Sequence, residues 1–223
     1  MLTVEEIQTA FKKFIELKDS DHRYASFDYC NNYFNNFQNK RDLAFPENLE
    51  KSCLHLGFFV SSWGMIRARS FLLQKSLRFY IPIIKWLANE CPENVWNIDV
   101  NKYSNENIEI LIKVYATLSQ FIPDENRKLV LVTKIMLGVF GNTPAFDDYF
   151  TTTFRDNYGE NTRYRRFNMN SLTAIKEFYN NNENLIEELR RSIKTYNFLT
   201  DDETNIFYTR AKIIDMIGFG YQL

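Results

Sequence analysis

The sequence predicts an all-α protein in which about nine or ten helices form a single domain, residues 1–223, around a buried central helix at roughly 125–138. Three observations support this fold class. Apolar residues recur at the spacing of one helix face through most of the chain. Glycine and proline number only 7 and 5 of 223 residues, whereas chains rich in loops and strands use more of both. Aromatic residues make up 16% of the chain, and their rings supply large apolar surfaces for packing between helices.

Three helices are predicted in the first part of the chain. Thr3 and Glu6 have the spacing of a capping box, which marks a helix start. A second helix is expected from near Asp21 to near Asn36, and a third from Pro46, because proline fits the first turn of a helix. The apolar positions of the third helix, whose wide spread predicts burial on more than one side, are Leu49, Cys53, Leu54, Leu56, Phe58, Phe59 and Val60.

A possible anion site follows the third helix. Gly64 can end that helix in a left-handed conformation, and the next helix is expected from Phe71 to Leu87, kinked or split at Pro82. Arg67 and Arg69 would then lie at its N-terminus, where the unpaired N–H groups and the positive end of the dipole already attract anions. In the alternative interpretation, the arginines pair with neighbouring carboxylates.

The central segment is the most apolar part of the chain. A connector at 88–103, where the domain could subdivide near 90–103, precedes a helix capped by Ser104 that runs to Ser119. A helix formed by residues 129–137 would have almost no polar face, which predicts that it is buried on all sides. A buried strand is the competing prediction, but the length and the preceding Pro123-Asp124 start signal favour a helix.

Four further helices are predicted in the last third of the chain. They are expected at 145–154, from Asn170 or Ser171 to Tyr179, from Glu183 to Tyr196, and from a second capping-box spacing at Thr200 and Glu203 to Gly218.

Lys134 is the strongest chemical candidate. It lies within the buried central helix, where an isolated ammonium group is costly, so it should form an ion pair, extend its amino group to the surface or be neutral. Asp147 or Asp148, just beyond the turn, are natural partners. A structural ion pair is one interpretation. The other is a catalytic site, because buried lysines can act as nucleophiles or bases. His55 is a further catalytic candidate, although the pattern favours a ring packed in or near the core with one hydrogen-bonded nitrogen.

A second basic region extends from Arg155 to Arg166. Arg163 and Arg165 are interleaved with Tyr158, Tyr164 and Phe167, which are residue types that hold phosphates and stack on bases. A solvated loop whose arginines are balanced by carboxylates is the alternative.

Composition limits the classes of function. The formal net charge of −1 gives no whole-molecule attraction to nucleic acid or to anionic lipid. We expect no secretory leader, no membrane span and no membrane partner. Three scattered cysteines and two histidines predict reduced thiols, no metal site and no cofactor, and hence a cytoplasmic protein.

Two resemblances can be stated. The segments S-S-W-G-M-I-R-A-R-S-F-L-L-Q (61–74) and T-K-I-M-L-G-V-F-G-N-T-P-A-F-D-D-Y-F (133–150) resemble a family of uncharacterised bacterial helical proteins, which implies no known activity. The order helix, L-G-V-F-G turn, helix and aspartate is also similar to the helix-hairpin-helix region of base-excision DNA glycosylases. Lys134 precedes the turn where those enzymes place their lysine after it, and Asp147 follows too closely, so we carry over no catalytic role.

Three hypotheses follow from the sequence. The first is a protein that binds a phosphate-bearing ligand, or nucleic acid, through Arg67, Arg69 and Lys134. The second is an enzyme whose site is lined by Lys134, Asp147 and His55. The third is a helical interaction module or homo-oligomer that uses its aromatic faces.

Overall fold

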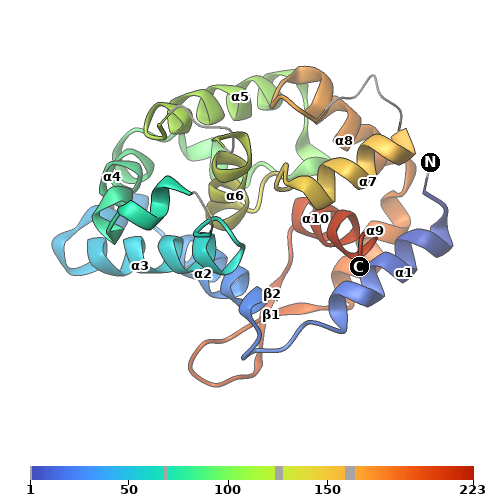
Figure 1. The fold of residues 1–223 in the computed structure, drawn as a ribbon, viewed down its shortest axis with the longest axis horizontal. Coiled ribbons are helices and arrows are strands. Elements are labelled where there is room, and N and C mark those ends of the chain that lie inside the picture. Colours follow the sequence, from blue (N-terminus) through green and yellow to red (C-terminus); the bar gives the residue numbers. More distant parts are fainter. Residues whose placement is uncertain (1, 68–69, 124–127, 159–163) are drawn as a thin grey trace.

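Ten α-helices and one short hairpin make up the part of the chain that the computed structural model describes, residues 2–67, 70–123, 128–158 and 164–223. Helix α6 lies at the centre, and the other helices surround it (Figure 1). The predicted all-α fold is confirmed. The elements are α1 (Val4–Ile15), α2 (Ser26–Asn36), α3 (Pro46–Ser62), α4 (Ile81–Asn89), α5 (Asn105–Gln120), α6 (Lys128–Phe140), α7 (Asp148–Tyr158), α8 (Met169–Asn181), α9 (Glu183–Arg191), β1 (Lys194–Tyr196), β2 (Glu203–Phe207) and α10 (Arg210–Gly220).

The central segment is a helix, as predicted, and not a strand. Every residue of α6 from Leu131 to Phe140 is buried, because α2, α3 and α5 pack around it. Its polar Thr133 is satisfied locally: the hydroxyl donates to the Leu129 carbonyl at 2.9 Å and accepts from the Phe146 N–H at 2.9 Å. This last bond holds the segment before α7 against α6, which places the start of α7 beside Lys134.

Helices α1 and α10 lie side by side, so the two ends of the described chain are close together (Figure 1). The capping box at the start of α1 is confirmed, with Glu6 N–H donating to Thr3 Oγ1 and Thr3 N–H to the Glu6 carboxylate. Gly220 allows the contact between these helices, because a side chain there would collide with the carbonyl oxygen of Ala10. Helix α10 is buried from Ala211 to Gly220, two residues beyond its predicted end.

The predicted helix from Phe71 to Leu87 is wrong. The chain forms two short 3₁₀ turns, Phe71–Gln74 and Leu77–Tyr80, and only then α4. Ser70 caps the first turn by accepting from the Leu72 N–H. Pro82 lies in the first turn of α4, where its missing N–H costs nothing, and it therefore starts the helix instead of splitting it. Arg67 consequently precedes a 3₁₀ turn, not the α-helix N-terminus expected of it.

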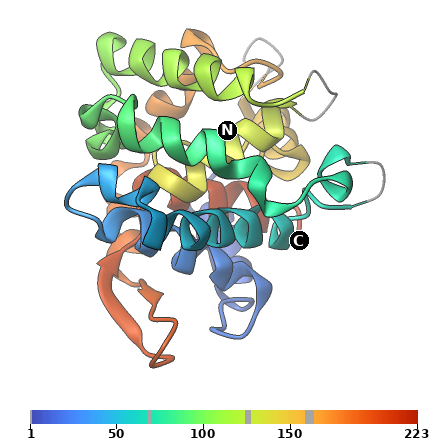
Figure 2. The same ribbon diagram turned by 90° about the vertical axis from the view of Figure 1, so that its left-hand side faces the viewer.

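The predicted helices at 183–196 and from Thr200 are also wrong in part. Helix α9 ends at Arg191, and the chain then forms the antiparallel hairpin β1–β2, in which Lys194 pairs with Phe207. The hairpin extends from the helical body in both views (Figures 1 and 2). Contacts with α2 explain the strand: the Tyr196 N–H donates to Asp28 Oδ2 at 2.9 Å, and the Tyr196 carbonyl accepts from Asn32 Nδ2 at 3.0 Å.

Several boundaries and faces also differ from the predictions. Helix α7 begins at Asp148 and not near Ala145, and α8 is capped by Asn168 instead of Asn170 or Ser171. The buried face of α3 is narrower than predicted, because the side chains of Leu54 and Phe58 are 45% and 57% exposed. Of the connector residues, Ile98 is buried and the Trp96 ring packs against Phe140.

No helix in the described part of the chain combines the length and the apolar composition needed to cross a membrane. All three cysteines are free thiols.

Candidate functional site

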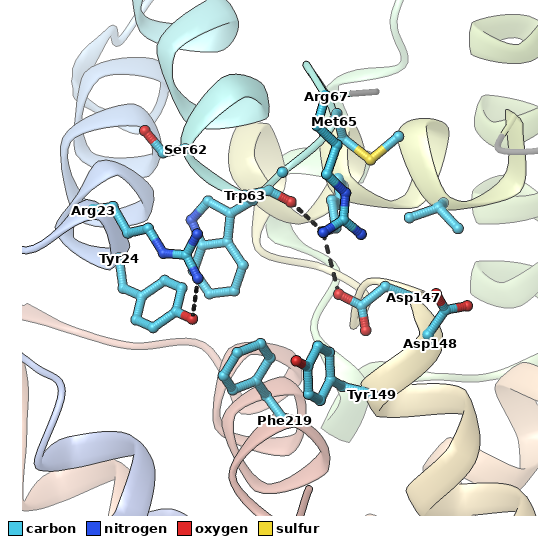
Figure 3. Close-up of a pocket in the computed structure, with 13 residues that line it drawn as sticks. Arg23, Tyr24, Ser62, Trp63, Met65, Arg67, Asp147, Asp148, Tyr149 and Phe219 are labelled. Carbon is cyan, nitrogen blue, oxygen red and sulfur yellow. Dashed lines mark hydrogen bonds and ion pairs between the residues drawn. The ribbon is translucent and has the colours of Figure 1, made fainter. Parts of the chain in front are cut away.

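A pocket of about 320 Å³ lies where the end of α3, the middle of α6, the start of α7 and the last turn of α10 meet (Figure 3). Two segments, 61–74 and 133–150, supply most of its lining. The described lining residues are Arg23, Tyr24, Ser62, Trp63, Gly64, Met65, Arg67, Val130, Lys134, Asp147, Asp148, Tyr149 and Phe219.

The sequence around Trp63 ends α3 in a way that turns its backbone toward α6. Gly64 has a φ of 76°, as the sequence predicted, and the Met65 N–H donates to the Val60 carbonyl at 3.1 Å. This wide turn is typical of a helix that ends at a left-handed glycine. The Trp63 carbonyl is thereby left without a helical partner, and it accepts a hydrogen bond from Lys134 Nζ at 2.7 Å.

Lys134 pairs with Asp147 and not with Asp148. Its side chain is 6% exposed, and Nζ lies 3.2 Å from Asp147 Oδ2. The other carboxylate oxygen of Asp147 accepts from the Phe150 N–H at 3.1 Å and so caps α7. The two dashed lines that lead from the Trp63 oxygen and from Asp147 in Figure 3 mark the bonds of Lys134. Since an ammonium group has three donors, one N–H of Lys134 remains uncommitted by these two contacts.

Two arginines line the same pocket and form no ion pair within the described residues. Arg67 lies against the backbone of Gly64. Arg23 stacks on the Tyr24 ring, with the guanidinium carbon 4.8 Å from the ring centroid, and donates to the Tyr24 hydroxyl at 2.8 Å. Sequence patterns did not single out Arg23, because it lies in a short 3₁₀ turn and reaches the pocket only through the packing of α2 against α3.

Aromatic rings form the wall of the pocket opposite Arg67 in Figure 3. The ring centroid of Trp63 lies 4.9 Å from that of Tyr24 and 6.1 Å from that of Phe219. The Phe219 centroid is in turn 4.6 Å from that of Tyr149. Tyr149 is 44% exposed at the pocket rim. The indole N–H of Trp63 is buried and finds no acceptor among the described residues. The pocket therefore combines an apolar ring wall with uncommitted hydrogen-bond donors.

A second lysine supports Trp63 from the core. Lys212 Nζ lies 4.0 Å from the Trp63 ring centroid and 4.7 Å from that of Phe27, and it pairs with Asp215 Oδ2 at 2.8 Å. The remaining Asp215 oxygen accepts from the Ala145 N–H at 3.0 Å. Burial lowers the pKa of Lys212, and the Asp215 carboxylate opposes that shift. The spacing of Lys212 and Asp215, three apart in an otherwise apolar helix, was a sequence signal for this pair.

Asp28 on α2 is a further buried carboxylate. Its Oδ2 accepts from the Tyr208 hydroxyl at 2.7 Å and from the Tyr196 N–H at 2.9 Å. Burial raises the pKa of Asp28 to about 6, although these two hydrogen bonds and the charges of Lys18 and Lys212 oppose the shift. Asp28 thus joins α2 to the hairpin and to Tyr208, which lies between β2 and α10.

The remaining sequence candidates do not reach this pocket. His55 stacks on Tyr33 with 4.1 Å between ring centroids, and burial lowers the pKa of its imidazole. Arg165 is exposed outside the pocket. Arg69 and Arg163 lie outside the described residues. The predicted stacking role of Tyr164 and Phe167 is wrong, because both rings are buried against Phe146.

Comparison of the chain with protein-family models, with curated proteins and with solved structures gave no match. Across the described ranges, no three His, Cys, Asp or Glu side chains are grouped so that they could hold a metal ion.

We expect Lys212→Met to lower the free energy of unfolding by about 3–5 kcal/mol, because it leaves Asp215 buried without its cation. Adding Asp215→Asn should recover part of that loss, since the double variant removes both charges. Urea unfolding of the wild type, both single variants and the double variant gives the interaction free energy between Lys212 and Asp215. Lys85→Met, at an exposed lysine of α4, is the control. Additive losses from the two single variants would contradict the pairing.

Asp28→Asn should change how stability depends on pH. Because the folded-state pKa of Asp28 is raised to about 6 from an ordinary value of 3.8, its contribution to stability is fully present below pH 3.8 and is lost as the pH rises through 6. Asparagine does not titrate, so the variant should gain on the order of 3 kcal/mol relative to wild type between pH 4 and 7. Urea unfolding across this range measures the difference, with the exposed Asp21→Asn variant as control. A constant difference from wild type would refute the raised pKa.

Proposed function

We propose that the pocket beside Trp63 binds a small phosphate-bearing ligand through Arg23 and Arg67. The observation that carries this proposal is that both arginines line one pocket and neither has a carboxylate partner in the described part of the chain. A guanidinium group presents its donors in a planar fork that matches the oxygens of a phosphate. Arginines left without an ion pair at a concave site are therefore available to an anionic ligand.

The charge balance of the pocket favours a ligand with a single phosphate. Three cationic and two carboxylate side chains are found among its described lining residues. Asp147 neutralises Lys134 directly, and Asp148 at the rim adds a further negative charge. A phosphate monoester carries a charge of about −1.5 to −2 near neutral pH. One such group is well matched to the arginines, whereas a polyphosphate or a nucleic-acid strand would bring several charges toward Asp148.

Lys134 supports this site as a positioning residue more than as a nucleophile. Its ammonium group is held between the Trp63 carbonyl and Asp147, and so it fixes α3, α6 and the start of α7 relative to one another. A nucleophilic lysine must be free to reach its substrate, whereas two contacts hold this ammonium group in place. The same pair therefore favours ligand binding over a covalent reaction at Lys134.

Isothermal titration calorimetry with ribose 5-phosphate tests the proposal. Arg67→Gln and Arg23→Gln should each weaken binding about tenfold or more, because a hydrogen bond to a charged group contributes roughly 1.5–3 kcal/mol. Arg191→Gln, at an exposed arginine of α9, should leave the affinity unchanged. The proposal fails if the two pocket variants bind as tightly as Arg191→Gln. It also fails if a single-stranded oligonucleotide binds more tightly than the monoester with a steep dependence on salt, which would indicate a nucleic-acid partner.

A further inference from the structure

We infer that the ligand is a nucleoside monophosphate, whose base lies against the aromatic wall while its phosphate meets the arginines. This inference rests on the proposed function and adds the chemical class of the ligand. It depends on two features of the pocket that a phosphate alone would leave unused: the ring wall and the Asp148 carboxylate at the rim.

Tyr149 is the ring best placed to stack on a base. It is 44% exposed at the rim, whereas Tyr24 is covered by Arg23 on one side and packs against Trp63 and Phe14. Phe219 supports the Tyr149 ring from within the core, with 4.6 Å between centroids and 35° between planes. A surface aromatic backed by a buried one is a rigid platform, and stacking of a base on such a ring strengthens binding by about tenfold or more.

A polar group beside this wall matches the edge of a base. Asp148, next to Tyr149 on the first turn of α7, is exposed and can accept from an exocyclic amino group. Figure 3 shows Asp148 and Tyr149 together at one side of the pocket, with Arg67 across from Tyr149.

The size of the pocket limits the ligand to one nucleotide. Its volume of about 320 Å³ lies at the lower end of the range of roughly 300–1,000 Å³ that small-molecule sites occupy. A dinucleotide cofactor would need a longer cleft, and inorganic phosphate would leave the ring wall uncovered. A base, a sugar and one phosphate fill the pocket from Tyr149 to the arginines.

Calorimetry with two probes that differ only in the base tests this inference. AMP should bind about tenfold more tightly than ribose 5-phosphate, which has the same phosphate and sugar. Tyr149→Leu should weaken AMP about tenfold while leaving ribose 5-phosphate unchanged, and Tyr149→Phe should retain wild-type affinity for both. Because Tyr149 is largely exposed, these variants should fold, which circular dichroism can check.

The two levels of the proposal fail in different ways. If AMP and ribose 5-phosphate bind equally and Arg67→Gln weakens both, the phosphate site stands and the assignment of a base is wrong. If Tyr149→Leu lowers the affinity for both probes by the same factor, the base assignment also fails. Ribose 5-phosphate has no base, so an equal loss would show that the Tyr149 ring does not stack on one. If neither probe binds, both the phosphate site and the nucleotide class are refuted.

Discussion

The structure depends on the position of Trp63 between two lysines. Lys212 from α10 lies 4.0 Å from the indole centroid, and Lys134 from α6 donates to the carbonyl of the same residue at 2.7 Å. A buried ammonium group is tolerated only when its charge is compensated. Here Asp215 and Asp147 supply the carboxylates, and the indole ring supplies a negative face for Lys212. Because these groups come from α3, α6, α10 and the start of α7, their pairing fixes four helices around one residue.

The pocket follows directly from this arrangement. Trp63 and Phe219 form its inner wall, the Lys134–Asp147 pair forms one side, and the left-handed turn at Gly64 carries Arg67 to its edge. The paired charges are structural, since each already has its partner. Within the described part of the chain, the groups that remain for a ligand are Arg23 and Arg67, which form no ion pair there, and the partly exposed ring of Tyr149. This division between satisfied and unsatisfied groups is the basis of the proposed ligand site.

The sequence predicted those parts of the structure that depend on local burial. A lysine within a helix with no polar side needs a carboxylate, so the partnership of Lys134 with an aspartate just past the turn could be foreseen. The choice of Asp147 could not, because it is decided by the capping of α7. Arg23 was missed for a similar reason: its position at the pocket arises from contacts between α2 and α3 that no spacing along the chain records.

The two capping-box spacings show where local prediction ends. Thr3 and Glu6 cap α1, whereas Thr200 and Glu203 have the same spacing and lie in a hairpin. Asp28 and Asn32 on α2 hold the strand that precedes Thr200 through hydrogen bonds to Tyr196. Non-local bonds of this kind override a local preference that contributes only about 1 kcal/mol. The predicted helix from Phe71 to Leu87 is also wrong, since two 3₁₀ turns precede α4 where one continuous helix was expected.

The most direct test of the Trp63 pocket is the ¹H–¹⁵N NMR spectrum of the indole groups during titration with AMP. The chain has three tryptophans, so Trp86→Phe and Trp96→Phe assign all three signals by elimination. The account predicts that the Trp63 signal shifts as AMP fills the pocket that Trp63 lines, while the signal of Trp96, which lines a separate cavity beside Lys40, stays in place. A Trp63 signal that does not move at saturating AMP, or a shift confined to Trp96, would contradict it.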